Sequence, residues 1–262
     1  MKFLHISDTH FLRDAEDAKG SLRDVLVRMT PPLEQLDKLL EAAGGPFDFV
    51  LHTGDLCDGG SAGDYRALRE GLERRFPGAP IHAVPGNHDR EGAWRDGWGE
   101  DFFRVKAARF GELAIVLLNS SDPKHPDGRI READCDLLER ALAEIGGRPS
   151  ILLLHHHLIP GQFTLPTAVY PERFRRIVAE SNLLALFNGH THHAHAGAFA
   201  GKPCYTAGSL SFRGTNRETA VAFDEFAAIN RCRFGPEGLF VEAISQGAKP
   251  RPLADIALPI RT

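Results

Sequence analysis

Residues 81–89 read IHAVPGNHD, a short apolar segment that ends in Gly86, Asn87, His88 and Asp89. Apolar runs of this length, bounded by proline and glycine, are typical of buried strands. An amide, an imidazole and a carboxylate directly after such a strand have no packing purpose. Because the carboxyl ends of strands in an α/β sheet meet at one edge, this stretch predicts a functional site there.

Four further segments repeat the layout, with ligand-type side chains directly after an apolar run. They are Asp8-Thr9-His10, Gly54-Asp55, His155-His156-His157 and Gly189-His190-Thr191-His192. Carboxylate, imidazole and amide oxygen together suit borderline divalent ions such as Zn, Mn, Fe or Co. Each segment alone is explained equally well by a turn or a helix cap, but five in one chain indicate a metal site. We interpret Gly54, Gly86 and Gly189 as residues that let the chain turn sharply.

Along the rest of the chain, stretches with a strand pattern alternate with stretches that have a helix pattern. Short apolar runs predict strands at residues 2–7, 47–52, 81–84, 150–154 and 183–188, and helical spacing predicts helices near 33–43, 65–76, 132–145 and 174–180. From residue 194 the pattern is that of strands. No linker or low-complexity tract divides the chain, so we expect one α/β domain over residues 1–262, with two packed mixed sheets flanked by helices. The proline-bearing stretch 246–262 is expected to form an extended tail.

The composition excludes some classes of protein. The net charge of −4 gives no general affinity for polyanions, and the sequence contains only short runs of basic residues. We assign them to solvated helix faces; they are Arg74-Arg75 and the set Arg173, Arg175 and Arg176. Nucleic acid is therefore disfavoured as a partner.

The chain also carries no pattern of membrane insertion or secretion. No apolar run approaches the roughly 18–20 residues that a membrane span needs, and residues 1–8 become polar too soon for a secretory signal. Cysteines 57, 135, 204 and 232 follow no CxxC spacing. We expect four free thiols and a cytoplasmic protein.

Taken in order, the motifs D-x-H, GD, GNHD, a histidine after an apolar strand, and GHxH resemble those of the calcineurin-like metallophosphoesterases. The resemblance runs from Asp8 to His192 and no motif is missing. The size of the chain and its start, HISDTHF at residues 5–11, are similar to the bacterial class III cyclic-nucleotide phosphodiesterases. The resemblance implies a four-layer αββα sandwich with two mixed sheets, in agreement with the pattern above.

The resemblance also implies two divalent metal ions. Asp8, His10 and His192 would bind the first ion, and Asn87, His155 and His190 the second. Asp55 would bridge the two ions. His88 would lie beside the phosphate as a hydrogen-bond or proton donor, with Asp58 fixing its tautomer. The reaction implied is hydrolysis of a phosphoester by a metal-bound hydroxide.

The histidine run departs from the family pattern. The family usually continues HHPP, whereas this chain reads HHHLIP at residues 155–160, so substrate contacts in this loop are not carried over. His156 could either support a metal ligand or contact the substrate. His157 is expected at the surface. Asp89 is interpreted as a turn cap. Six other histidines are interpreted as polar strand or loop residues: His5, His52, His82, His125, His193 and His195.

The predicted substrate is a small phosphodiester, and a cyclic nucleotide is the first candidate. The alternative is a phosphomonoesterase or broad-specificity phosphoesterase, since both reactions use the same metal pair; a nuclease or a scaffold without activity is less favoured. Substrate choice is expected to come from three loops, residues 11–20, 120–129 and 158–170. Their candidate contacts are Arg13, Arg129, Phe163 and Tyr170. The tail could cover the site or pack on a second subunit, so a homo-oligomer remains open.

Overall fold

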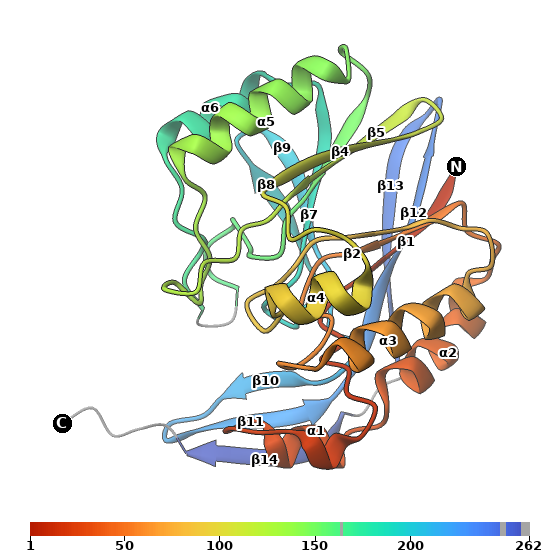
Figure 1. The fold of residues 1–262 in the computed structure, drawn as a ribbon, viewed down its shortest axis with the longest axis vertical. Helices are drawn as coiled ribbons and strands as arrows, with labels where there is room; N and C mark the ends of the chain where they lie inside the picture. The colour runs from red at the N-terminus through yellow and green to blue at the C-terminus, as the bar shows by residue number, and fades with distance from the viewer. Residues whose placement is uncertain (163–164, 247–249, 258–262) are drawn as a thin grey trace.

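The computed structural model describes residues 1–162, 165–246 and 250–257. Its main body consists of four layers, helix, sheet, sheet and helix (Figure 1). Helices α5 (Glu132–Glu144) and α6 (Glu172–Glu180) cover one outer face. Helices α2 (Pro32–Ala43) and α3 (Ala62–Arg75), with α4 (Glu91–Trp98), cover the other. The predicted αββα sandwich is confirmed.

The first sheet has five strands and is mixed. Its order is β13 (Gly238–Ser245), β12 (Ala228–Gly235), β1 (Lys2–Ile6), β2 (Phe49–His52) and β3 (Ile81–Ala83). Strands β1, β2 and β3 are parallel, whereas β12 runs antiparallel to β1. The carboxyl ends of β1, β2 and β3 therefore meet at one edge of the sheet.

The second sheet has six strands and is also mixed. Its order is β4 (Val105–Phe110), β5 (Leu113–Leu118), β6 (Ser150–Leu153), β7 (Leu183–Asn188), β9 (Lys202–Thr206) and β8 (His195–Phe199). Strands β6 and β7 are parallel neighbours, so their carboxyl ends also lie together. Strands β4 and β5 pair antiparallel and form a hairpin at one edge of this sheet.

The two sheets pack on each other through a dry apolar layer. Phe3 of β1 stacks on Phe49 of β2, with ring centroids 4.6 Å apart, and Phe187 of β7 meets Phe3 edge-on at 6.0 Å. Leu153 and Ile115 complete this layer and are fully buried. Large aromatic side chains contribute much of the apolar area that stabilises such a core.

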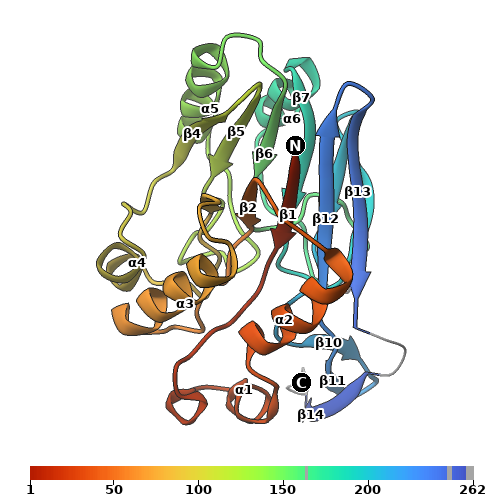
Figure 2. The ribbon, with the colours of Figure 1, turned by 90° about the vertical axis from the view of Figure 1, so that its right-hand side faces the viewer.

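A third sheet, not predicted from the sequence, lies beside the sandwich (Figure 2). It consists of β10 (Arg213–Asn216), β11 (Ala220–Glu225) and β14 (Arg251–Ala257), with β11 in the middle. Helix α1 (Arg23–Arg28) packs on it through Leu26, which shares a core with Leu253. The described part of the predicted tail is thus largely a paired strand; residues 247–249 and 258–262 lie outside the described residues.

The remaining expectations from composition are met in part. All four cysteines are free and buried. The basic pairs lie on helix faces and are matched by acids: Arg75 contacts Asp37, and Arg173 contacts Asp136 and Glu139. Within the described residues, no helix is both long and apolar enough to cross a membrane.

Candidate metal centre and active site

The segments after β1, β2, β3, β6 and β7 meet at the end of the sandwich where the carboxyl ends of these strands lie. The first group of side chains that this arrangement brings together is Asp8, His10, Asp55 and His192, whose ligand atoms all lie within 4.8 Å of one another. His10 Nε2 lies 3.2 Å from His192 Nε2 and 3.6 Å from Asp55 Oδ2. His192 Nε2 lies 3.4 Å from Asp8 Oδ1. These are the residues predicted for the first metal ion together with the predicted bridge.

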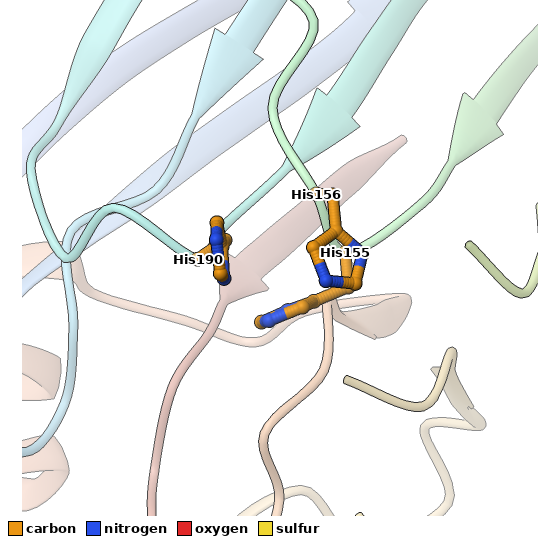
Figure 3. Close-up of side chains that lie close together, drawn as sticks. All are labelled: His155, His156 and His190. Atoms are coloured by element: carbon orange, nitrogen blue, oxygen red, sulfur yellow. The ribbon is translucent and has the colours of Figure 1, made fainter. Parts of the chain in front are cut away.

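The second group lies on the other side of Asp55. His155 Nε2 is 3.3 Å from Asp55 Oδ2 and 3.0 Å from Asn87 Oδ1. His190 faces His155 from the segment after β7, with ring centroids 5.1 Å apart (Figure 3). The Oδ2 atom of Asp55 thus lies near His10 on one side and near His155 on the other. All seven predicted ligands are at one place, and Asp55 is between the two groups.

The ligand atoms suit divalent ions because the lone pairs of several histidine nitrogens point toward the same place, and these nitrogens carry no hydrogen. His192 donates from Nδ1 to the Phe212 carbonyl at 2.7 Å, and His155 donates from Nδ1 to the Thr53 carbonyl at 2.7 Å. In the neutral rings these bonds leave the Nε2 lone pairs facing inward. The Nε2 atom of His190 is buried and has no hydrogen-bond partner. Only a cation or a proton satisfies such a set of acceptors.

The pKa shifts point to the same need for positive charge. Burial lowers the pKa of His10 and of His190, so both rings are neutral. Burial also disfavours a charged His155, yet the carboxylates of Asp55 and Asp8 raise its pKa to about 9. Without a metal ion, a proton is therefore held between His155 and Asp55. A divalent ion would replace that proton.

The backbone of the site is unusual. Among the described residues, six that are not glycine have positive φ, and five of them are predicted ligands. These are Asp8 (φ 53°), His10 (43°), Asp55 (51°), His190 (73°) and His192 (60°). Left-handed backbone costs a residue with a side chain on the order of 1–3 kcal/mol and tends to cluster at functional sites. The surrounding fold holds these residues in a geometry that aims them inward.

Two of the three glycines beside the ligands, Gly86 and Gly189, have a different role from the predicted one. Of the three, only Gly54 has positive φ, so Gly86 and Gly189 are not needed for left-handed turns. A β-carbon at Gly86 would lie 2.1 Å from Asp55 Oδ1, and one at Gly189 would lie 1.8 Å from Ser7 Oγ. These glycines are required because ligand-bearing segments press against their α-carbons.

His88 and Asp58, the predicted catalytic pair, lie beside the first group. His88 Nδ1 donates to Asp58 Oδ1, which also lies 3.4 Å from His10 Nδ1. Burial lowers the pKa of His88, but Asp55 and Asp58 outweigh it and raise the pKa to about 9. The pair leaves His88 Nε2 available and favours its protonated form, as a proton donor requires.

Asp89 supports the loops rather than the chemistry. Its carboxylate accepts hydrogen bonds from the backbone N–H groups of Leu56, Cys57 and Gly86, and from the hydroxyl of Tyr65 at 2.8 Å. It therefore ties the loop of Asp55 to the loop of Asn87 and His88, which is a broader capping role than the predicted turn.

His156 occupies a supporting position. Although Figure 3 shows its ring beside those of His155 and His190, both of its ring nitrogens are already used. Ser120 Oγ donates to Nδ1 at 2.8 Å, and Nε2 donates to the Pro126 carbonyl at 2.9 Å. His156 thus anchors the loop of residues 119–131 to the end of β6.

His157 is a correction. We expected it at the surface, but it is fully buried. Its ring lies nearly parallel to that of His190, with centroids 5.9 Å apart, and its carbonyl accepts the N–H of Ala168. The chain after β6 folds back over it, which the sequence pattern did not indicate.

Two strand histidines, His5 and His52, lie beneath the site and are held by hydrogen bonds. His5 Nε2 donates to Thr53 Oγ1 at 2.9 Å, and Asn230 Nδ2 donates to His5 Nδ1 at 3.1 Å. His52 Nε2 lies 3.1 Å from Thr9 Oγ1. Burial lowers the pKa of His5 and of His52 to about 3, so both stay neutral. Thr53 connects His5 to the site because its carbonyl orients His155, and His52 contacts Thr9, which lies between the ligands Asp8 and His10.

A cavity of about 680 Å³ opens at His88 and Asn87 and continues between residues 12–22 and residues 58–61. It includes one of the three loops expected to select the substrate. Of the single residues predicted for that purpose, Arg13 pairs with Asp64, and Tyr170 packs on Phe199; their contact with substrate stays a prediction. The N–H of Arg129 binds the Ser120 carbonyl. Phe163 lies outside the described residues.

The sequence profile described as calcineurin-like phosphoesterase matches residues 1–194. The chain belongs to this family. A cAMP/cGMP dual specificity phosphodiesterase of Mycobacterium tuberculosis is 30% identical over 219 residues, covering 80% of this chain and 67% of that protein. The 3′,5′-cyclic adenosine monophosphate phosphodiesterase CpdA of Escherichia coli is 31% identical over 165 residues, covering 61% and 56%.

The fold is also similar to that of a solved structure. A dimetal phosphatase from Danio rerio superposes with a TM-score of 0.58 at 16% identity, covering 93% of this chain and 98% of that one. Family membership confirms the prediction of a metal-dependent phosphoester hydrolase. Among the described residues, three sets have ligand atoms close enough to hold a metal ion: Asp8, His10, Asp55 and His192; His155, His156 and His190; and His10, Asp58 and His88.

Proposed function

We propose that this protein hydrolyses small phosphodiesters, with 3′,5′-cyclic nucleotides as the first candidates, at a site for two divalent ions. The observation that carries the proposal is the placement of Asp55 between two converging ligand groups, with His88 beside them at the mouth of a nucleotide-sized cavity. Relatives named as cyclic-nucleotide phosphodiesterases support the choice of substrate class.

Each residue has a specific task in this proposal. Asp8, His10 and His192 would hold one ion, Asn87, His155 and His190 would hold the other, and Asp55 would serve both groups. When bound, such ions activate water and neutralise charge on the phosphate. His88 donates a hydrogen bond to the phosphate and a proton to the leaving oxygen from Nε2. Asp58 accepts the hydrogen at His88 Nδ1 and so fixes the ring.

The identity of the ions is proposed from the donor set. Imidazole nitrogens outnumber carboxylates, which favours Mn, Fe, Zn or Co over Mg or Ca. The number of ions, a cytoplasmic location and a homo-oligomeric state stay predictions.

The test is an activity panel on protein reconstituted with each ion in turn. It compares bis-p-nitrophenyl phosphate, p-nitrophenyl phosphate, 3′,5′- and 2′,3′-cyclic nucleotides and a glycerophosphodiester. We expect diesters to be hydrolysed with the higher kcat/KM, and Asn87→Ala to abolish hydrolysis while the circular dichroism spectrum is retained. A clear preference for p-nitrophenyl phosphate would instead support the phosphomonoesterase alternative.

A further inference from the structure

A further strand ends at the same edge as the strands that precede the predicted ligands. Strand β9 runs parallel to β7, so residues 207–212, which follow β9, lie beside the segment of His190 and His192. These residues read AGSLSF and include no predicted ligand. All of them are buried. We call residues 207–212 the serine segment.

The serine segment binds the backbone of Asp8. The hydroxyls of Ser209 and Ser211 donate to the Asp8 carbonyl oxygen at 2.9 and 2.8 Å. The Asp8 N–H donates to the Gly54 carbonyl at 3.0 Å. Both polar groups of the Asp8 backbone are therefore fixed by other segments, while its φ is 53°.

The two hydroxyls matter because the backbone of Asp8 is left-handed. This conformation is unfavourable for a residue with a side chain, so it persists only where the surroundings hold it. The Asp8 carboxylate lies 3.4 Å from His192 Nε2. A rotation of the Asp8 backbone would move the carboxylate away from that nitrogen. The serine hydroxyls therefore hold a ligand of the first group in place.

Phe212, the last residue of the serine segment, contacts the histidines of the first group. Its carbonyl accepts the Nδ1 hydrogen of His192 at 2.7 Å. Its ring packs against His192 and His10, with ring centroids 4.6 and 5.1 Å apart. In a closely packed interior, such a ring restricts the rotation of both imidazoles. The serine segment thus contacts Asp8, His10 and His192.

The serine segment is itself anchored to other elements. The N–H of Leu210 donates to the Ser7 carbonyl at 3.1 Å. Gln35 Nε2 of α2 donates to the Ser211 carbonyl at 3.0 Å. The hydroxyls are therefore held in position before any ion binds, as residues that orient metal ligands must be.

The second group has no equivalent contact. Within the described chain, residues 207–212 form no hydrogen bond or ring contact with Asn87, His155 or His190. His155 is oriented instead by the Thr53 carbonyl at the end of β2. The support that the serine segment provides is thus specific to the first group.

We propose that Ser209, Ser211 and Phe212 are positioning residues that raise the affinity of the first metal site and leave that of the second unchanged. They act through Asp8, His10 and His192 rather than as ligands. This rests on the two-ion site of the proposed function. Residues that orient metal ligands typically contribute about 10–100-fold to metal affinity.

The test is a calorimetric titration of metal-free protein with Mn²⁺, in which His192→Ala identifies the binding step of the first group and His155→Ala that of the second. We expect Ser211→Ala to weaken the first step about tenfold and to change the second less than about twofold, because one donor to Asp8 is lost. The matched control is Ser150→Ala, which should change neither step. Ser150 is buried at the other end of β6, and its hydroxyl has no hydrogen-bond partner.

Phe212→Leu is a second variant of the serine segment. It keeps the carbonyl that orients His192 but removes the ring that packs on His10 and His192, so it should also weaken the first step. Denaturant unfolding of each metal-free variant measures its loss of stability separately. A purely structural role would lower the stability and leave the ratio of the two affinities unchanged, whereas a positioning role changes that ratio.

Two results overturn the inference. One is a first step in Ser211→Ala that lies within about twofold of that in Ser150→Ala, and the other is equal weakening of both steps. Hydrolysis of bis-p-nitrophenyl phosphate by the reconstituted wild type separates this failure from a wider one. If the diester is hydrolysed and Ser211→Ala leaves the ratio of affinities unchanged, only the inference is wrong.

The opposite failure can also be recognised. If two ions bind but no diester of the panel is hydrolysed, the proposed function is wrong, and the two binding steps still decide the role of the serine segment. A wild type that binds fewer than two ions would overturn both.

Discussion

The two large sheets contribute differently to the site. The segments after β1, β2 and β3 supply Asp8, His10, Asp55, Asn87 and the donor His88, so the first sheet carries both carboxylates of the ligand set. The segments after β6 and β7 supply imidazoles alone: His155, His190 and His192. The negative charge and the acid–base chemistry thus lie on one sheet, while the other adds neutral lone pairs.

Several contacts nevertheless join the sheets at the site, among them those of His192 with Asp8 and with His10. Asp55 reaches His155 across the sheet interface, and the Thr53 carbonyl from the end of β2 orients the same ring. Asp55 lies close to a histidine of each ligand group, His10 and His155, so its loss should affect both groups, whereas the loss of one second-sheet histidine should affect one group. The following four predictions are ordered by the size of the effect.

Asp55→Asn should cause the largest loss. It removes half of the ligand charge and the contact to both groups, so we expect kcat on bis-p-nitrophenyl phosphate to fall on the order of 10³-fold or more, together with loss of bound metal. Activity and metal content by elemental analysis are measured on the same sample, with the exposed Asp24→Asn as the matched control. If the variant retained two ions and its activity, Asp55 would not be the residue that joins the two ligand groups.

His88→Asn should lower kcat by about 10²–10³-fold while bound metal is unchanged, because a proton donor contributes on that scale and His88 is not in the ligand set. Asp58→Asn should cost less, since it acts through the orientation of His88. The same assays apply. Loss of metal in step with activity in His88→Asn would place His88 among the ligands instead.

The stability of metal-free protein should fall as pH rises from about 7 to 8.5. The pKa values of His88 and His155 are raised to about 9 from the usual 6.5, so folding binds protons in this window. Their stabilisation is complete below pH 6.5 and is lost as pH rises through about 9, at up to about 1.4 kcal/mol per pH unit for each histidine.

Metal binding should oppose this trend, because neutral imidazoles bind metal ions more tightly as pH rises. Denaturant unfolding at several pH values, with chelator and with added Mn or Zn, measures both slopes. A metal-free protein whose stability is flat or rises between pH 7 and 8.5 would contradict the proton held between Asp55 and His155.

Ser120→Ala should have the smallest effect. It removes the donor to His156 Nδ1 and should lower the free energy of unfolding by about 1 kcal/mol, with a few-fold change in kcat. The exposed Ser245→Ala is the control. A loss of bound metal in Ser120→Ala would indicate that His156 supports the ligands directly rather than anchoring the loop.

The sequence was sufficient for features that depend on local pattern. Short apolar runs located β1, β2, β3, β6 and β7, and the polar residues after them could be placed at a shared edge because strand ends converge. Helix α2 and its end at Gly44, whose φ is 67°, follow from periodicity and glycine. The clustering of the ligand side chains was therefore predictable without the structure.

Features that depend on distant partners were not predictable. Strand β12 pairs with β1, more than 220 residues earlier in the chain, and it contains Asn230 and Arg231, which disguise its pattern. Asn230 is acceptable there only because it binds His5, and Arg231 because it contacts Glu242 of β13. Helix α4 was also missed, since Gly97 lowers helix propensity and is explained only by its contact with the Ala62 carbonyl.

The pairing of β14 with β11 has a consequence for solubility. A chain shortened before Arg251 would leave β11 with a row of unpaired backbone N–H and C=O groups, and such an exposed edge promotes association between molecules. It would also remove Leu253 from beneath α1. Shortened forms of this protein are therefore expected to aggregate, even though every predicted metal ligand lies elsewhere in the chain.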